Sequence, residues 1–268
     1  MKPIRVVVLG ALGRMGRAIL DAMATDRNFH LKGAVVREKA TQKGATLEKH
    51  GLKVWGDAPL HGSLASVATR NDVVIDVTKA DAVTRNLLWA AKSRIPYVLA
   101  VTGLDVKTQK LIQQASKKIP IVAASNFSMG VAVLDEVAWI AAALLPEADI
   151  EIVESHHRYK KDAPSGTAMS LARSIVSSAQ RNQQIIFGRP RKGERKKGSI
   201  TIHSVRGGDT IGEHRIHLFL DGERIELTHI AASRAIFARG ALRAARFVVG
   251  RRPGLYTMHD VLGLGRKT

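Results

Sequence analysis

Two adjacent histidines, His156 and His157, stand in a segment that reads ESHHRYKKDAPSGTA over residues 154–168. An imidazole titrates near neutral pH, so either ring can donate a proton to a bound molecule. The arginine and two lysines that follow are side chains that bind carboxylates. The segment therefore predicts a pocket for an anionic substrate beside a proton donor. It does not predict a metal site, because no third histidine or carboxylate follows at a ligand spacing.

The same segment ends where a helix is expected to begin. Ser165, Gly166 and Thr167 precede the run AMSLARSIVSSA, which has the pattern of a helix. Hydroxyl residues before such a run are typical N-cap residues, and the N-terminus of a helix attracts anions. We therefore expect the hydroxyls and amides of this turn to face outward and to complete the carboxylate pocket.

The run before the histidines, DIEIVESHH, has the pattern of a strand. Side chains of a strand point alternately to opposite faces. His156 and His157 therefore cannot both enter one cleft by strand geometry. We expect one of them to face the ligand and the other to line the rim, unless the strand ends first.

A glycine-rich turn, GALGRMG over residues 10–16, follows the strand-like run 4–9 and precedes a helical pattern over 14–23. Glycines at such a turn let the backbone approach a pyrophosphate, and the helix N-terminus offers it amide donors. The spacing is G-x-x-G-x-x-G rather than the commoner G-x-G-x-x-G. Its position predicts a dinucleotide cofactor, with a tight turn that binds nothing as the alternative.

The end of the second strand, Val35-Val36-Arg37-Glu38, bears on the choice of nicotinamide cofactor. An arginine there pairs with the 2′-phosphate of NADP, whereas an acidic residue accepts hydrogen bonds from the ribose of NAD. We expect Arg37 to favour NADPH, with Arg14 and Lys39 as further cations. A shift of the turn by one residue would bring Glu38 to the ribose and favour NADH, and Arg37 would then be an ordinary surface residue.

Strands and helices alternate through the first half of the chain, which predicts a Rossmann-like, doubly wound α/β domain with a parallel sheet. After residue 126 the pattern changes to an α+β domain with an open mixed sheet. Its strands 199–206, 214–221 and 224–231 have the pattern of an antiparallel meander. We expect a dinucleotide-binding domain over 1–126, rejoined by 237–268, and a substrate-binding and oligomerisation domain over 127–236. The open sheet favours self-association, because its apolar face needs a cover.

Composition limits the classes of protein that remain. The 268 residues carry a formal net charge of +19, no cysteine and only 4% aromatic residues. Cysteine chemistry is thereby excluded, and no apolar run is long enough for a membrane span. The N-terminus lacks the pattern of a secretory signal, so we expect a cytoplasmic protein. The charge makes nucleic acid a partner to consider, but the cations are dispersed, and the basic run RPRKGERKK, residues 189–197, is typical of an exposed loop.

The segment 154–168 resembles the signature of the dihydrodipicolinate reductase (4-hydroxy-tetrahydrodipicolinate reductase) family. The likeness covers nearly the whole chain through the motifs VVLGALGRMG, DVVIDVTKAD, the VTG turn, AASNFSMGV, SVRGGDTIGEH and LTHIAASRAIFARGA. The resemblance implies the NAD(P)H-dependent reduction of dihydrodipicolinate on the diaminopimelate route to lysine. It also implies a homotetramer in which open sheets of the substrate domains pack together.

On the matching positions, the resemblance makes His156 the general acid and Lys160 a second proton donor or imine-side cation. It places the substrate carboxylates at His157, Ser165, Gly166 and Thr167. For the cofactor it implies the turn residues Gly10, Ala11, Leu12, Gly13, Arg14 and Met15, with Arg37, Ala100, Val101, Thr102, Ser125, Asn126 and Phe127.

The sequence departs from the family pattern at two places. The family's Gly-Thr-Thr-Gly turn is Ala100-Val101-Thr102-Gly103 here, so Ala100 and Val101 match only by position. The family more often has an acidic residue where Val36 stands, and its loss favours NADPH. One alternative is a related NAD(P)-dependent reductase of another anionic imine or keto acid. A second alternative, from the charge, is a nucleic-acid-binding protein on a reductase-like scaffold.

Overall fold

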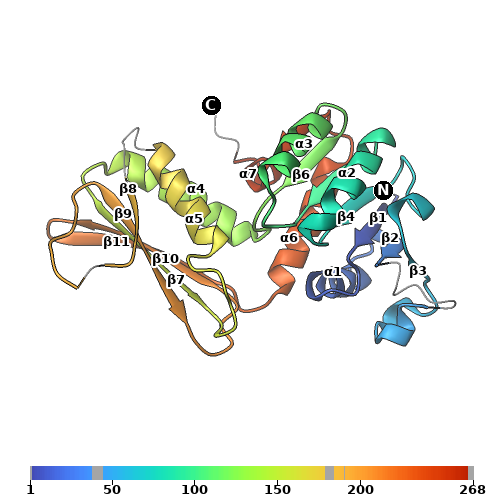
Figure 1. The fold of residues 1–268 in the computed structure, drawn as a ribbon, viewed down its shortest axis with the longest axis horizontal. Helices are drawn as coiled ribbons and strands as arrows, with labels where there is room; N and C mark the ends of the chain where they lie inside the picture. Colours follow the sequence, from blue (N-terminus) through green and yellow to red (C-terminus); the bar gives the residue numbers. More distant parts are fainter. Residues whose placement is uncertain (1, 38–44, 179–183, 190, 265–268) are drawn as a thin grey trace. The chain divides into compact units, whose positions relative to one another are not determined.

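The chain folds into two compact units in the computed structural model, which describes residues 2–37, 45–178, 184–189 and 191–264 (Figure 1). The first unit comprises Met1–Met129 with Arg234–Thr268, and the second comprises Gly130–Ser233. The last part of the chain thus returns to the unit in which the chain begins.

A seven-stranded parallel sheet forms the centre of the first unit. Its strands are rich in β-branched residues and buried on both faces, as expected of a parallel sheet covered on both sides. The strand order is β12-β6-β5-β4-β1-β2-β3. The strands are β1 (Ile4–Leu9), β2 (Phe29–Val35), β3 (Leu60–His61), β4 (Val73–Asp76), β5 (Tyr97–Leu99), β6 (Pro120–Ala123) and β12 (Gly254–Tyr256).

Helices cover this sheet in two pairs, since α1 packs against α6 and α2 packs against α3. This arrangement confirms the predicted doubly wound, Rossmann-like class. The helices are α1 (Arg14–Ala24), α2 (Ala80–Lys92), α3 (Val106–Ser116), α6 (Ala235–Val248) and α7 (Met258–Leu262), with 3-10 turns η2 (Glu48–His50), η3 (Lys53–Trp55) and η4 (Leu64–Ser66).

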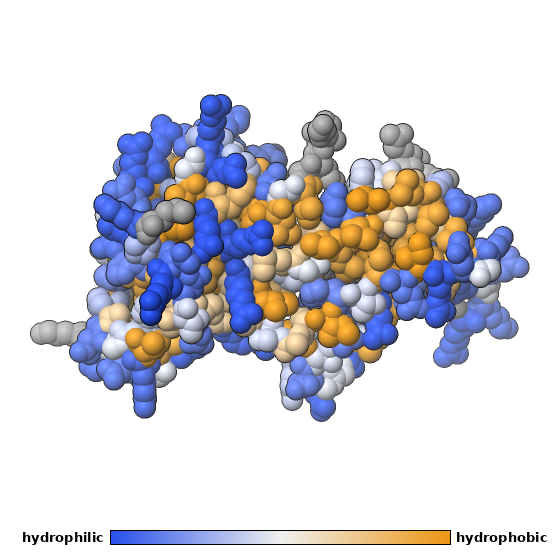
Figure 2. All heavy atoms as spheres, turned by 180° about the vertical axis from the view of Figure 1, so that it is seen from behind, coloured by the Kyte–Doolittle hydropathy of each residue, from blue (hydrophilic) through white to orange (hydrophobic). Residues whose placement is uncertain are grey.

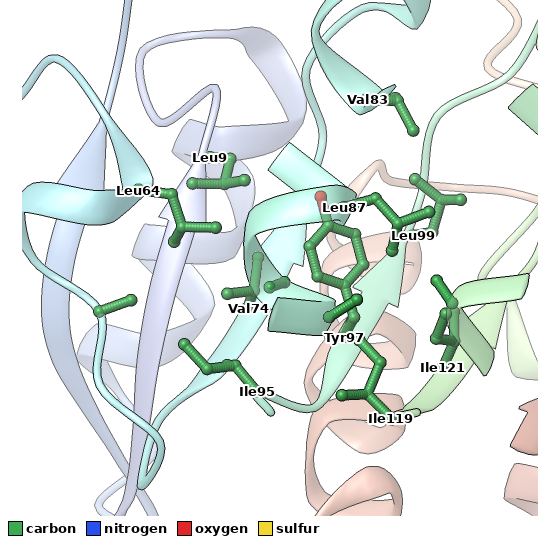
Figure 3. Close-up of a cluster of buried hydrophobic side chains, with 14 of the residues drawn as sticks. Leu9, Leu64, Val74, Val83, Leu87, Ile95, Tyr97, Leu99, Ile119 and Ile121 are labelled. Atoms are coloured by element: carbon green, nitrogen blue, oxygen red, sulfur yellow. The ribbon is translucent and has the colours of Figure 1, made fainter. Parts of the chain in front are cut away.

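One core of the first unit lies between the sheet and α2 and α3 (Figure 3). Leu9, Val74 and Leu99 enter it from the strands, and Leu87 enters it from α2. Tyr97 is the exception among these apolar side chains, because its fully buried ring carries a hydroxyl group that needs a partner.

A five-stranded mixed sheet forms the second unit, in the order β11-β10-β7-β9-β8. Two helices pack on one face, and the isoleucines of β7, β9 and β10 fill the core between them and the sheet. The elements are α4 (Met129–Leu144), β7 (Asp149–His156), α5 (Gly166–Ser178), β8 (Gln184–Phe187), β9 (Ser199–Arg206), β10 (Glu213–Leu220) and β11 (Glu223–Ile230). The apolar face of the sheet is therefore covered by its own helices.

The predicted meander of three strands is wrong in one respect. The turn at Asp221-Gly222 joins β10 and β11 into the expected antiparallel hairpin. However, β9 pairs in parallel with β7 and β8, and β7 lies between β9 and β10. The loop after β9 crosses the end of β7, where Gly207 N donates to His156 O (3.0 Å) and Arg158 N donates to Gly208 O (3.2 Å). Alternation predicted the strands but not which of them are neighbours.

Among the described residues, no helix combines the length and the apolar character that crossing a bilayer requires.

Candidate active site

The glycine-rich turn joins β1 to α1 in the tightly packed form that a dinucleotide site needs. Gly10 has a φ of +82°, and a Cβ there would lie 2.9 Å from Val77 O. A Cβ on Gly16 would collide with the backbone of Gly10 and Ala11. Gly10 N and Ala11 N both donate to Val35 O, at 2.8 and 3.2 Å. Glycine is therefore required at both positions, which leaves the turn open to a close ligand.

The N-terminus of α1 is the part of this turn that can hold an anion. Gly13 is the N-cap residue and supplies no side-chain cap, and both Gly13 and Arg14 are exposed. Ala11 is buried, whereas Leu12 and Met15 are half-buried. Uncapped amides at a helix N-terminus, with an arginine beside them, suit a pyrophosphate.

Further predicted cofactor residues follow the carboxyl ends of other parallel strands, and these ends share one edge of the sheet. Arg37 is exposed after β2, while Glu38 and Lys39 lie outside the described residues. After β5, Ala100 N donates to Asp76 O (2.9 Å), Val101 is buried and Thr102 is exposed. Val101 thus contributes its side chain to the core.

The segment after β6 holds the last three predicted cofactor residues. Ser125 is exposed, and the side chain of Asn126 accepts a hydrogen bond from Ser128 N (2.7 Å). Phe127 is buried, and its backbone lies so close to Gly240 of α6 that no side chain fits there. Phe127 is thus fixed by the packing of its own unit.

Asp76, which sequence reasoning did not select, anchors this edge of the sheet. One oxygen accepts hydrogen bonds from Thr78 N (2.9 Å) and Thr78 Oγ1 (2.5 Å). The other accepts from Tyr97 Oη (2.5 Å) and Asn86 Nδ2 (3.2 Å). Burial and the adjacent Asp76 carboxylate raise the pKa of Tyr97. The carboxylate therefore fixes the turn that packs against Gly10.

The histidine segment begins at the end of β7. Ile150, Ile152, Glu154 and His156 are the buried residues of this strand, so the core face continues into two polar side chains. His157 lies just beyond the strand and is half-buried. The strand thus ends between the two histidines, which is the exception allowed for in the prediction that they lie on opposite faces. In the described part of the chain, Nδ1 of His157 is buried without a hydrogen-bond partner.

Glu154 is the residue that holds His156. Oε2 of its fully buried side chain lies 2.5 Å from Nδ1 of His156. Arg206, which pairs with His156 in the β7–β9 register, binds both carboxylate oxygens, at 2.9 and 2.7 Å. Burial alone would raise the pKa of Glu154, but hydrogen bonds from His156, Arg206 and Ser204 outweigh it and lower the pKa to about 2. Glu154 is therefore an anion near neutral pH.

His214 of β10 closes the other side of the ring. The two imidazoles meet edge to face, with centroids 5.4 Å apart. Burial, followed by the neighbouring His156, lowers the pKa of His214 to about 3, so this ring is neutral. Nε2 of His214 lies 3.3 Å from Oγ of Ser165, and Oγ also accepts from Ala168 N (3.2 Å). Ser165 is thus the N-cap of α5, but its buried hydroxyl faces inward and not outward as expected.

Lys160 lies in the loop after β7, where it binds a neighbouring carboxylate. Its Nζ is 2.9 Å from both carboxylate oxygens of Asp162. Desolvation acts to raise the pKa of Asp162, but the hydrogen bond from Lys160 prevails and lowers it. Gly166 is exposed and Thr167 half-buried at the start of α5. In the second unit, Glu154 therefore joins His156, Ser165 and Arg206, and His214 contacts both His156 and Ser165.

Three residues of this cluster were missed by sequence reasoning: Glu154, Arg206 and His214. The alternation of β7 was a usable signal for Glu154, because residues two apart in a strand share a face. Arg206 and His214 lie in the motif SVRGGDTIGEH, but their approach to His156 depends on strand pairings that the motif does not reveal.

Comparison with known proteins gives a consistent result over the whole chain. The model of the N-terminal domain of dihydrodipicolinate reductase matches residues 4–127, and that of the C-terminal domain matches residues 130–262. A protein named 4-hydroxy-tetrahydrodipicolinate reductase from Pseudomonas fluorescens (strain Pf0-1) is 42% identical over 265 residues, which covers 97% of this chain and 99% of that protein. One of the same name from Aquifex aeolicus (strain VF5) is 40% identical over 267 residues, with the same coverage.

A solved structure agrees with these sequence matches. The dipicolinate-bound dihydrodipicolinate reductase from Paenisporosarcina sp. TG-14 aligns with a TM-score of 0.77 and 25% identity, over 96% of this chain and 98% of that one. Two domain models that together span nearly every residue, and relatives at 40% identity or more over 97% of the chain, show that it belongs to the dihydrodipicolinate reductase family of oxidoreductases.

Proposed function

We propose that this chain reduces 4-hydroxy-tetrahydrodipicolinate (dihydrodipicolinate) to tetrahydrodipicolinate with NADPH or NADH, in the biosynthesis of diaminopimelate and lysine. The observation that carries the proposal is the buried His156 ring, which Glu154 holds at one nitrogen within a segment of three cations and a helix N-terminus. The names of the relatives state this activity. The ligand of the related solved structure is a cyclic dicarboxylate, the kind of anion that such a segment binds.

The first unit is proposed to bind the dinucleotide. The crowded glycines of the β1–α1 turn and the uncapped N-terminus of α1 fit a pyrophosphate. When bound, the nicotinamide supplies the hydride for the reduction. Thr102, Ser125 and Asn126 follow strand ends at the same edge of the sheet and are proposed to line the nicotinamide side.

The second unit is proposed to bind and protonate the substrate. His156 donates a proton to the carbon next to the one that has received the hydride, which completes the reduction of the carbon–carbon double bond conjugated to the imine. Lys160 acts as a second donor or as a cation beside the imine. Nδ1 of His157, which has no hydrogen-bond partner among the described residues, and the first amides of α5, at Gly166 and Thr167, suit a substrate carboxylate. Ser165 serves this turn through its cap and not through a free hydroxyl.

Arg37 is proposed to give a preference for NADPH, because it is exposed directly after β2 where a 2′-phosphate is bound in this fold. Its neighbour Val36 is buried and offers no carboxylate to a ribose. Substitution Arg37→Ala is expected to raise KM for NADPH about tenfold and KM for NADH less than about twofold, as loss of a charged hydrogen bond predicts. Arg27→Ala is the matched control, because Arg27 is exposed at the opposite end of the same strand.

The deciding experiment is a coupled assay that generates the substrate in situ, run with NADPH and with NADH. Turnover with either cofactor supports the proposed reaction, and absence of turnover with both refutes it in favour of another anionic imine or keto acid. An NADPH to NADH ratio that Arg37→Ala and Arg27→Ala leave equally unchanged would reduce Arg37 to a surface residue.

We also propose that the chain assembles as a homotetramer through the second unit, in the cytoplasm. The sheet face opposite α4 and α5 exposes Val205, Phe219 and Ile230. In Figure 2 a broad apolar area (orange) lies on the side of the second unit, and four exposed apolar residues of that unit come from α4: Val133, Val137, Ile140 and Leu144. Contiguous apolar surface of this kind favours association. Light scattering is expected to give the mass of four chains, and a monomer at every concentration would contradict it.

A further inference from the structure

We propose that Glu154 and Arg206 are positioning residues for proton transfer: Glu154 orients His156 and holds its protonated ring, and Arg206 holds Glu154 and the Lys160 loop. This inference rests on the proposed function, in which His156 protonates the substrate. Neither residue need touch substrate or cofactor, because both act through His156 and Lys160.

The contact with Glu154 determines which nitrogen of His156 faces the substrate. An ionised carboxylate only accepts hydrogen bonds, so the 2.5 Å contact requires a proton on Nδ1 of His156. Nε2 is then the nitrogen that exchanges its proton with the substrate. It lies beside Gly212, where an added Cβ would stand 3.1 Å away, so the absence of a side chain there leaves room around Nε2.

Glu154 is itself held in place by hydrogen bonds from two other elements. Arg206 binds both of its oxygens, and Ser165 N donates to Oε1 at 3.2 Å. The carboxylate is therefore held from β9 and from the start of α5. A general acid has to be held within a fraction of an ångström of its productive position, and a partner fixed on two sides supplies that constraint.

Arg206 also reaches the second proposed proton donor. Its Nη2 donates to Asp162 O at 2.6 Å, and the carboxylate of Asp162 binds Nζ of Lys160 at 2.9 Å. One guanidinium thus joins the position of His156, through Glu154, to that of Lys160, through Asp162. Loss of the guanidinium is expected to disturb both donors.

Glu154 and the guanidinium bound to it place one anion and one cation near the ring of His156. Among the described residues, Glu154 of β7 is the only anion in direct contact with the ring, and Arg206 of β9 is the cation bound to that anion. His214 of β10 is a neutral ring that meets His156 edge to face, and Lys160 acts on His214 as a further cation. An adjacent anion favours the imidazolium, whereas cations oppose it. Without the charge of Glu154, the protonated ring would be left beside the guanidinium of Arg206 and the neutral ring of His214.

The test compares Glu154→Gln with Glu151→Gln, a matched control on the same strand. Oε2 of Glu151 also binds a histidine, His203 at 2.7 Å, and its Oε1 binds Arg195 at 2.9 Å, but on the opposite face of the sheet. Glu154→Gln is expected to lower kcat about 30-fold or more and to change KM by less than about threefold. The basic limb of the plot of kcat against pH is expected to move to lower pH by about one unit. Glu151→Gln is expected to leave kcat within about twofold and the limb unmoved.

A second readout does not depend on turnover. The ring nitrogens of His156 are titrated by NMR in the substrate-free protein, with His156→Gln used to assign them. Glu154→Gln is expected to move the midpoint of His156 to lower pH, and Arg206→Lys, which keeps the charge but loses the two-pronged contact, is expected to lower kcat by less than Glu154→Gln does.

The proposal would be overturned if Glu154→Gln and Glu151→Gln had equal effects on kcat and on the basic limb of its pH profile. It would also be overturned if Glu154→Gln left the midpoint of the His156 titration unchanged. If Glu154→Gln does not fold, Arg206→Lys decides in its place: loss of kcat at unchanged KM supports the proposal, and wild-type kinetics refute it. A wild-type protein inactive on the proposed substrate would refute the proposed function, while the NMR titration would still decide whether Glu154 holds the charged ring.

Discussion

Strand β7 carries two clusters of the same composition, one on each face of its sheet. On the helix-covered face, Glu154 binds His156 and Arg206. On the opposite face, Glu151 binds His203 and Arg195. The side chains differ in exposure: Glu154 and His156 are 0% and 11% exposed, whereas Glu151 and His203 are 14% and 32% exposed. We call them the inner and the outer triad.

The difference shows that position and not residue type distinguishes a proposed site from a structural contact. The inner triad lies at the carboxyl end of β7, where the loop after β9 crosses and α5 begins. The outer triad lies nearer the start of the strand, where Arg195 also binds Asp149 at 2.5 Å and Ser199 O at 2.5 Å. Arg195 belongs to the basic run that was expected to be an exposed loop, and here it fastens that loop to the sheet.

The largest expected effect is on turnover when the histidines of the two triads are exchanged for glutamine. His156→Gln is expected to lower kcat about 100-fold or more, since general acid catalysis typically contributes about 10²–10⁴-fold, with a smaller effect on KM. His203→Gln is expected to stay within about twofold of wild type. Steady-state kinetics of both variants measure this contrast. Equal losses in kcat and in substrate affinity from His156→Gln would argue against proton transfer by this ring.

The sequence allowed most of the framework of the first unit to be predicted. Short β-branched runs followed by helical patterns predicted β1, α1, the end of β2 and the alternation of strands and helices that follows, because local periodicity reports which faces are buried. The two-residue β3 and three-residue β12 were not predicted, since strands so short have no detectable period. Their place at the two edges of the sheet depends on pairing with distant residues.

The site in the second unit was only half predictable for a related reason. His156, Ser165 and Lys160 lie within one continuous segment, so their types alone suggested an anion pocket. Arg206 lies 52 positions from its partner Glu154 and reaches it because β9 pairs in parallel with β7. The sequence patterns favoured a meander, which would have put β10 beside β9. Pairing between strands is set by the packing of the whole unit, and short-range patterns do not contain it.

A smaller effect is expected in the pH dependence of stability, and it concerns a histidine that packs against the inner triad. His214, packed against that triad, has its pKa lowered from 6.5 to about 3 by burial. In acid the folded state then binds fewer protons than the unfolded state. The contribution of the neutral His214 ring to the free energy of unfolding is therefore fully present above pH 6.5 and is lost as the pH falls towards 3. The loss amounts to about 2 kcal/mol by about pH 5, at ~1.4 kcal/mol per unit.

Urea unfolding between neutral pH and about pH 5 measures this slope, and His214→Gln is expected to remove most of it. His229→Gln is the control, because His229 faces His214 from β11 and its pKa is also lowered by burial, but its ring is less buried. It is expected to remove a smaller part. If His214→Gln leaves the pH dependence of the free energy of unfolding unchanged, protonation of His214 is not what destabilises the protein in acid.

The smallest expected effect is on the free energy of unfolding. It compares an exposed and a more buried glutamate on the sheet face that carries the outer triad. Glu226 pairs with Arg224 at 2.6 Å, but these side chains are 39% and 59% exposed, against 14% for Glu151. An exposed ion pair contributes about 0–1 kcal/mol, whereas loss of a more buried, charged hydrogen bond costs about 1.5–3 kcal/mol. Glu226→Gln is therefore expected to change the free energy of unfolding by less than about 0.5 kcal/mol. Glu151→Gln is expected to cost about 1 kcal/mol or more.

Both variants are compared by urea unfolding at one protein concentration, because any assembly through this face adds to stability by mass action. Added salt is expected to shrink the small effect of Glu226→Gln further and to leave that of Glu151→Gln nearly unchanged, since buried pairs are screened less than exposed ones. If both substitutions lower the free energy of unfolding equally, the exposure of a contact on this sheet does not determine how much that contact stabilises the protein. The distinction between its inner and outer triads would then have to rest on turnover alone.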